Sequence, residues 1–241
     1  MPDQKNRFES PSHAPEKMMW GQLRPHVILP KLLKHALTKV PRSTFVPACY
    51  QECCYHDDNI PLREKHQKQR FLLAPLTLGK LFVHADLETI SHKKALILCG
   101  GTGYSAALFG QMNIDCIMIE NHIELADQAT ENLTLYPNVF VKSMSIDLIN
   151  YVLGEDFFDI IFIDGGAIES IPSSLLEKLT PTGFLLALQQ QKAPCLDKLS
   201  LCWGVKISRE GISSILFDVW APVNQDFNAP SSFGFFTPRI G

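Results

Sequence analysis

A glycine-rich loop and a carboxylate that follows it are the residues whose types and spacing indicate chemistry. The loop, Gly100-Gly101-Thr102-Gly103-Tyr104, comes directly after a short apolar run. Glycines let a chain turn sharply and let its backbone approach a ligand closely, because no Cβ intervenes. Glu120 follows about 20 residues later, where a carboxylate can accept hydrogen bonds from both ribose hydroxyls of a nucleoside. The residues expected to bind such a cofactor are Gly100, Gly101, Thr102, Gly103 and Glu120.

Two kinds of cofactor fit this pattern. Residues 101–106 satisfy G-x-G-x-x-G/A, which is typical of dinucleotide-binding enzymes. S-adenosylmethionine uses the same strand, loop and helix, with the loop beneath its methionine part. A tight turn that binds no ligand is a third interpretation, because a glycine pattern of this length is a weak signal by itself.

Alternating strands and helices are expected to position the loop. Short apolar runs predict strands, and apolar residues at helical spacing predict helices between them. The expected strands are 95–99, 116–120, 139–141, 158–164 and 183–188, and the expected helices are 104–112, 123–133 and 173–179. This order predicts an α/β, Rossmann-like fold with a mainly parallel sheet. Ligands bind such sheets at the carboxyl ends of the strands, where the loop and Glu120 stand.

The rest of the chain extends this core at both ends. Residues 1–17 are rich in Pro, Ser and charge, which predicts a mobile tail. Residues 18–92 predict a helical region packed on the core, with helices entered at Pro30 and near Pro75. Residues 93–241 are the expected cofactor-binding core, in one structural domain with 18–92. Near its end, the turn at 209–211 predicts an antiparallel strand pair.

Composition excludes several classes of protein. The 241 residues include 22 Lys+Arg and 25 Asp+Glu, and 46% are hydrophobic, which is typical of a globular chain. The formal charge of −3 argues against a dedicated nucleic-acid binder. No apolar run approaches the roughly 18–20 residues that span a bilayer. The start of the chain lacks the apolar segment of an export signal, so the seven cysteines are expected to be reduced thiols in the cytoplasm.

Metal and hydrolase chemistry find little support in the sequence. Cys49, Cys53, Cys54 and His56 provide only one of the two ligand sets of a zinc site, so ordinary thiols are expected and no metal. The serine elbow G-x-S-x-G and the phosphate loop G-x-x-x-x-G-K-[ST] are absent. No residue stands out as a catalytic acid, base or nucleophile. The basic run 63–70 is expected to be a solvated loop, or a surface that attracts an acidic substrate.

The loop and several blocks around it resemble the protein-L-isoaspartate O-methyltransferase family of class I methyltransferases. The loop block is Gly101-Thr102-Gly103-Tyr104-Ser105-Ala106-Ala107. The other resembling blocks are 21–25, 40–42, 45–47, 71–75, 158–167, 171–172, 175–176, 179, 216–218 and 221–222. Their common order and spacing make the resemblance far more specific than the glycines alone.

The resemblance implies a fold, a cofactor and a reaction. The fold is that of class I methyltransferases, and the cofactor is S-adenosylmethionine. The reaction is methyl transfer to the carboxylate of an abnormal, isoaspartyl residue in a protein or peptide. The resemblance also implies that Glu120 would hold the ribose of the cofactor, and that Arg24 and residues 72–75 would lie over the substrate entrance.

Among the departures from the family's pattern, three residues keep other functions open. Ile97 stands where the family usually has an acidic residue, Cys99 where it has a glycine, and Leu73 where it often has a serine. These departures motivate a second hypothesis, a non-catalytic S-adenosylmethionine-binding or interaction protein that kept the fold. A third, a nicotinamide dinucleotide enzyme, rests on the G-x-G-x-x-A match alone.

Overall fold

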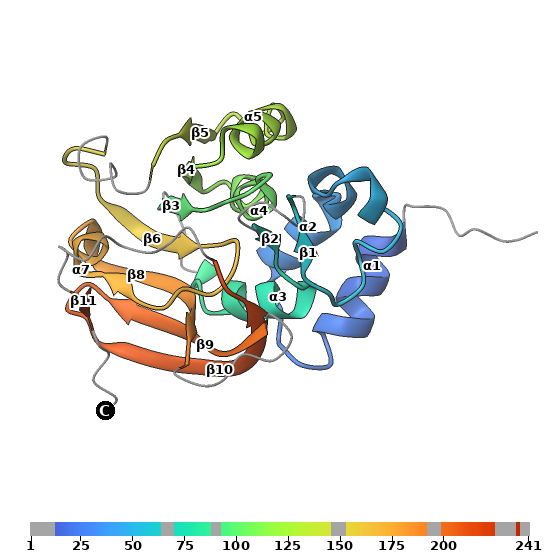
Figure 1. Cartoon of the computed structure of the whole chain (residues 1–241). Helices are drawn as coiled ribbons and strands as arrows, with labels where there is room; N and C mark the ends of the chain where they lie inside the picture. Colours follow the sequence, from blue (N-terminus) through green and yellow to red (C-terminus); the bar gives the residue numbers. More distant parts are fainter. Residues whose placement is uncertain are drawn as a thin grey trace, which may run out of the picture.

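A seven-stranded sheet forms the centre of the molecule (Figure 1). The structure is a computed structural model that describes residues 13–63, 70–87, 93–145, 153–191, 199–224 and 235–236. The strand order is β10-β9-β8-β6-β3-β4-β5. The strands are β3 Lys94–Leu98, β4 Asp115–Glu120, β5 Val139–Ser143, β6 Phe158–Ile163, β8 Leu179–Gln190, β9 Leu199–Ser208 and β10 Ser213–Pro222.

Strand direction follows the prediction. Strands β5, β4, β3, β6 and β8 are parallel neighbours, whereas β9 pairs antiparallel with both β8 and β10. Residues 95–98 of β3 are all buried, as expected for a parallel strand that is covered on both faces. The turn between β9 and β10 closes where Gly211 N donates to Ser208 O at 3.0 Å. The Rossmann-like fold and its antiparallel C-terminal pair are therefore confirmed.

Helices cover both faces of the sheet. Helices α4 (Tyr104–Gln111) and α5 (Ile123–Asn132) pack on one face together with α2 (Lys31–Lys39) and α3 (Pro75–Val83), whereas the short α7 (Ser173–Leu176) packs on the other (Figure 1). Phe109 joins α4 to both α3 and β6, with ring centroids 4.7 Å from Phe82 and 5.8 Å from Phe162. In the described parts of the chain, no helix is long and apolar enough to cross a bilayer.

The amino-terminal region contains more structure than the sequence predicted. Helix α1 (Ala14–Met18) begins inside the segment expected to be a tail, with Pro15 buried, and residues 1–12 lie outside the described residues. A π-helical turn, η2, and two 3-10 turns, η3 and η4, follow at Met19–Leu23, Arg42–Phe45 and Ala48–Tyr50. The short strands β1 (Ile60–Pro61) and β2 (Phe71–Leu72) pair antiparallel, as do β7 (Ile171–Pro172) and β11 (Phe235–Phe236). Two-residue strands have no periodicity to reveal them.

Gly204 in β9 provides a test of the C-terminal pair. A Cβ at this position would lie 2.5 Å from ring atoms of Phe217 in β10, whereas one at Gly21 in η2 would meet nothing within 4 Å. We expect Gly204→Ala to lower the free energy of unfolding by about 1–3 kcal/mol, because the ring or the strand must move. Gly21→Ala is the control and should cost nothing, since alanine favours helix. Equal urea midpoints for the two variants would contradict this packing.

Candidate functional site

Three neighbouring strands end side by side and bring the loop to two carboxylates. Cys99 N donates to Ile119 O at 2.9 Å, and Asp164 N donates to Leu98 O at 2.9 Å, so the ends of β3, β4 and β6 stay in register. Above this edge, Gly101 N donates to Glu120 Oε2 at 2.8 Å. The structure thus places the predicted loop directly against the predicted carboxylate. Asp164, at the end of β6, completes the edge.

The loop and the residue before it turn through left-handed backbone at three positions. The φ angles are 58° at Gly101 and 96° at Gly103, which precedes α4, and both are conformations that glycine adopts freely. Cys99 has a φ of 58° as well. A side chain in this region costs about 1–2 kcal/mol. The backbone at Cys99 therefore keeps the conformation of the glycine that the resemblance places there.

Gly100 and Thr102 contact the elements that surround the loop. Thr102 Oγ1 donates to Phe45 O at 2.5 Å, and Asn132 Nδ2 donates to Thr102 O at 3.0 Å. A Cβ at Gly100 would lie 2.7 Å from Met118 Sδ, so this glycine allows close packing on β4. Gly100 and Thr102 fix the loop against η3, α5 and β4, and a cofactor-binding role for them stays a prediction.

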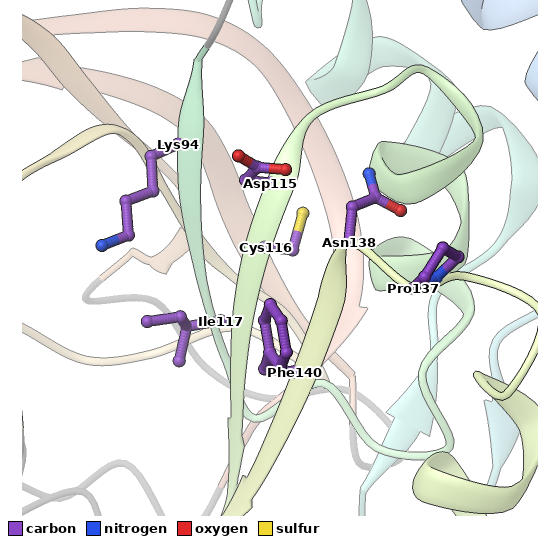
Figure 2. A pocket seen from close by; sticks show the side chains of 7 residues that line it. All are labelled: Lys94, Asp115, Cys116, Ile117, Pro137, Asn138 and Phe140. Carbon is purple, nitrogen blue, oxygen red and sulfur yellow. The ribbon is translucent and has the colours of Figure 1, made fainter.

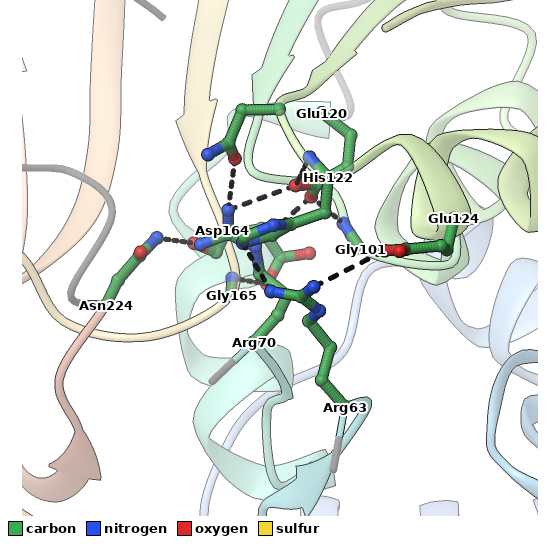
Figure 3. A network of polar contacts seen from close by, with 10 residues as sticks. Arg63, Arg70, Gly101, Glu120, His122, Glu124, Asp164, Gly165 and Asn224 are labelled. Carbon is green, nitrogen blue, oxygen red and sulfur yellow. Dashed lines mark hydrogen bonds and ion pairs between the residues drawn. The ribbon is translucent and has the colours of Figure 1, made fainter. Parts of the chain in front are cut away.

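Arg70 is the residue at this edge that the sequence did not reveal (Figure 3). Its Nε donates to Glu120 Oε2 at 3.1 Å, and its Nη2 donates to Glu120 Oε1 at 3.0 Å and to Asn121 Oδ1 at 2.6 Å. Both side chains of the Arg70–Glu120 pair are fully buried. No local pattern connects them, because they are far apart in the chain.

The surface-loop prediction for residues 63–70 is therefore wrong for Arg70. Arg63, at the other end of the basic run, pairs with the exposed carboxylate of Glu124 at 3.3 Å. Residues 64–69 lie outside the described residues. The two arginines that frame the run thus differ in burial, because the side chain of Arg63 is 13% exposed and that of Arg70 is fully buried.

Four hydrogen bonds occupy the Glu120 carboxylate. Oε2 accepts from Arg70 Nε and Gly101 N, and Oε1 accepts from Arg70 Nη2 and from His122 N at 3.1 Å. An ionised carboxylate has about four acceptor positions, so none is left for a ribose hydroxyl. With Arg70 in this position, the nucleoside that the resemblance implies does not fit Glu120.

Asp164 is the second buried carboxylate at the edge. It accepts hydrogen bonds from Ser105 Oγ and from Gly165 N, the latter at 2.8 Å. Burial raises the pKa of Asp164 to about 6, and it outweighs the hydrogen bonds and the positive charges of Arg70 and Arg42, which lower the pKa. This carboxyl group therefore changes charge near pH 6.

Arg42 fixes the segment that precedes α3. Its Nε donates to Cys54 O at 2.6 Å and its Nη2 donates to Leu73 O at 2.7 Å, while burial lowers the pKa of the guanidinium. The side chain of Leu73 is itself fully buried, so it contributes apolar packing where the family often has a serine. Arg24, expected over a substrate entrance, lies at the surface with its guanidinium 4.2 Å from the ring centroid of Trp20.

Among the described residues, no group of three His, Cys, Asp or Glu side chains is arranged to hold a metal ion.

A groove lies away from this edge of the sheet. It has a volume of about 650 Å³ and lies at the amino ends of β3 and β4, near Lys94 and Asp115 (Figure 2). Because it is at the opposite end of these strands from the loop, it is separate from the candidate site.

Comparison with known proteins gives consistent matches. Residues 13–200 match the family described as protein-L-isoaspartate(D-aspartate) O-methyltransferase. The protein-L-isoaspartate O-methyltransferase of Methanoculleus marisnigri is 28% identical over 197 residues, which cover 81% of this chain and 83% of that protein. The protein of the same name from a Bradyrhizobium species is 30% identical over 179 residues, 73% of this chain and 80% of the relative.

Solved structures show the same fold. A putative protein-L-isoaspartate O-methyltransferase from Plasmodium falciparum, in complex with S-adenosyl-L-homocysteine, superposes with a TM-score of 0.68 at 17% identity, covering 90% of this chain and 99% of that one. A second protein-L-isoaspartate O-methyltransferase gives 0.67 at 17% identity, covering 87% of this chain and 65% of that one. At this identity the likeness establishes the fold alone.

The raised pKa of Asp164 predicts how stability depends on pH. The folded chain binds this proton more tightly than the unfolded chain, where the pKa is near 3.8. The free energy of unfolding should therefore fall by up to about 3 kcal/mol from this group as pH rises from 4 to 6. Asp164→Asn should remove that part of the fall. Urea unfolding of both proteins between pH 4 and 7 measures it, and parallel curves would contradict the raised pKa.

Arg42 predicts a second effect on stability. Arg42→Met should lower the free energy of unfolding by at least about 2 kcal/mol, because two buried carbonyls lose their donor. Arg24→Met is the matched control, since it removes only an exposed contact with Trp20 worth about 0.5–1 kcal/mol. Chemical denaturation followed by circular dichroism compares the two variants. Similar losses would show that Arg42 has no special structural role.

Proposed function

This chain belongs to the protein-L-isoaspartate(D-aspartate) O-methyltransferase family, and we propose that it is an S-adenosylmethionine-dependent methyltransferase that acts on isoaspartyl carboxylates of proteins or peptides. The family match over residues 13–200 carries this proposal. The position of the glycine loop against Glu120, at the carboxyl edge of a parallel sheet, supports it, because ligands bind such sheets there.

The proposed reaction needs positioning more than acid–base chemistry. Bound S-adenosylmethionine supplies the methyl group, and the accepting carboxylate is already ionised at neutral pH. The main task of the chain is then to hold two reactants in line, which can supply a large part of the rate enhancement. The residues proposed to hold the cofactor are Gly100, Gly101, Thr102, Gly103 and Glu120, the last once it is released from Arg70. We propose no catalytic acid or base.

The substrate side of the proposed site is the segment before α3. Arg42 donates to Leu73 O, and its guanidinium lies 5.3 Å from the ring centroid of Tyr104, so it links this segment to the loop. Pro75 begins the helix that follows the segment. The proposed substrate is a protein or peptide and not a nucleic acid, in line with the formal charge of −3. We place the reaction in the cytoplasm, where thiols such as the buried Cys54 stay reduced.

A second candidate is a family member that lost turnover, and two residues favour it. Ile97 is fully buried in the apolar core and supplies no carboxylate, although the family usually has an acidic residue there. Arg70 occupies the carboxylate proposed for the ribose. Binding of S-adenosylmethionine without methyl transfer would support this candidate.

Titration and a methyl-transfer assay test the proposed function. We expect the wild-type chain to bind S-adenosylmethionine and S-adenosylhomocysteine but not NAD. It should methylate an isoaspartyl peptide and leave the same peptide with a normal aspartyl residue unchanged. No binding of either adenosyl compound would refute the cofactor, and binding without transfer would refute the reaction.

Glu120 has a matched control in Glu124. Glu120→Ala should weaken S-adenosylhomocysteine binding about tenfold or more, because the ribose hydroxyls lose their acceptor. Glu124→Ala should leave affinity unchanged, since that carboxylate is 70% exposed and pairs with Arg63. Isothermal titration measures both variants after circular dichroism confirms their folding. Unchanged affinity in Glu120→Ala would remove Glu120 from the site.

A further inference from the structure

We propose that Arg70 is a built-in competitor for the cofactor: its guanidinium takes the acceptor positions of Glu120 that a ribose would use, and so sets the affinity of the site. The inference rests on the proposed function, because it assumes that an adenosyl compound is the natural ligand. The residue concerned, Arg70, is the last of the basic run 63–70.

The contact imitates the edge of a ribose. Two neighbouring N–H groups of Arg70 donate to the two oxygens of Glu120, at 3.1 and 3.0 Å. The two hydroxyls of a ribose would donate to the same oxygens. Charge-assisted, bidentate pairs of this kind are among the stronger hydrogen bonds in proteins. A nucleoside must therefore displace Arg70 before Glu120 can accept from it.

The packing around Arg70 shows that the chain fills this space itself. A Cβ on Gly165 would collide with Arg70 Cδ, and a Cβ on Gly101 would lie 2.6 Å from Leu62 Cδ1 and 3.5 Å from Arg70 Cγ. The open space beside Gly101 and Gly165, which a ligand could use to reach the backbone, is thus filled by Leu62 and Arg70. Because the side chains of Arg70 and Glu120 are both 0% exposed, the pair is covered on every side.

Hydrogen bonds hold the main chain on both sides of Arg70. Leu62 N donates to Arg70 O at 2.8 Å, and Phe71 N donates to Gly165 O at 3.2 Å, so the main chain on both sides of the arginine is fixed. The long arginine side chain, in contrast, turns about several single bonds. In this proposal Arg70 leaves Glu120 by a change of side-chain rotamers, and the buried pair must also be uncovered before a ligand reaches it.

The proposal gives Arg70 two positions, one paired with Glu120 and one displaced from it, and the balance between them sets the measured affinity. If only a fraction of the molecules has Glu120 unoccupied, the apparent dissociation constant increases by the inverse of that fraction. Removing the guanidinium should remove this penalty. A variant without the Arg70 guanidinium would then bind the cofactor more tightly than the wild type. Loss of a residue that binds the ligand would have the opposite effect.

Titration with S-adenosylhomocysteine tests the proposal on the full chain. Arg70→Met should bind at least tenfold more tightly than the wild type, and Arg70→Lys, which cannot bridge both oxygens in the same way, should lie between them. The control is Arg63→Met, which removes an arginine of the same segment that does not contact Glu120 and should change affinity less than twofold. Equal or weaker binding in Arg70→Met, with measurable binding in the wild type, overturns the competitor and leaves the proposed function standing.

A second measurement uses the wild-type chain, in case Arg70→Met fails to fold around an unpaired Glu120. A crystal structure with S-adenosylhomocysteine should show the ribose hydroxyls on Glu120 and the Arg70 guanidinium beyond hydrogen-bond distance of it. A bound ligand with the Arg70–Glu120 pair intact overturns the competitor alone. Absence of binding in the wild type and in every folded variant overturns both the competitor and the proposed cofactor.

Discussion

Two buried carboxylates at one edge of the sheet have to be compensated, and two arginines from the amino-terminal region provide this compensation. Glu120 ends β4 and Asp164 follows β6, the two strands that flank β3. Arg70 binds Glu120 directly, and Arg70 and Arg42 both favour the charged form of Asp164. An unpaired charge at such depth costs several kcal/mol. The amino-terminal region is therefore attached to the core by charge as well as by apolar packing.

The glycine loop is built on the same constraint. Its left-handed turns bring Gly101 N to Glu120 and start α4 at Gly103, and Cys99 adopts the same kind of backbone in spite of its side chain. The strain at Cys99 persists because its N–H is fixed to Ile119 O of the neighbouring strand. The backbone geometry of the loop has thus been retained where one of its residue types has changed.

Family membership and the local departures are compatible, because fold and site depend on different residues. The family match extends over most of the chain, and the predicted fold is confirmed at the level of strand direction. Under the proposed function, affinity and turnover would depend on a few side chains at one edge of the sheet. Arg70, Cys99 and Ile97 are all fully buried at or near this edge, and β3 still pairs in register with β4 and β6.

The sequence alone determined the alternation of strands and helices, the C-terminal strand pair and the position of the loop against Glu120. These features depend on local periodicity and on glycine, which are visible within a few residues of the chain. Only the tertiary structure revealed the occupant of Glu120. Arg70 belongs to a basic run that resembles any solvated loop, and its partner lies in a strand 50 residues away. Burial and pairing of a charge depend on which distant segments meet, and that is decided when the amino-terminal region packs on the sheet.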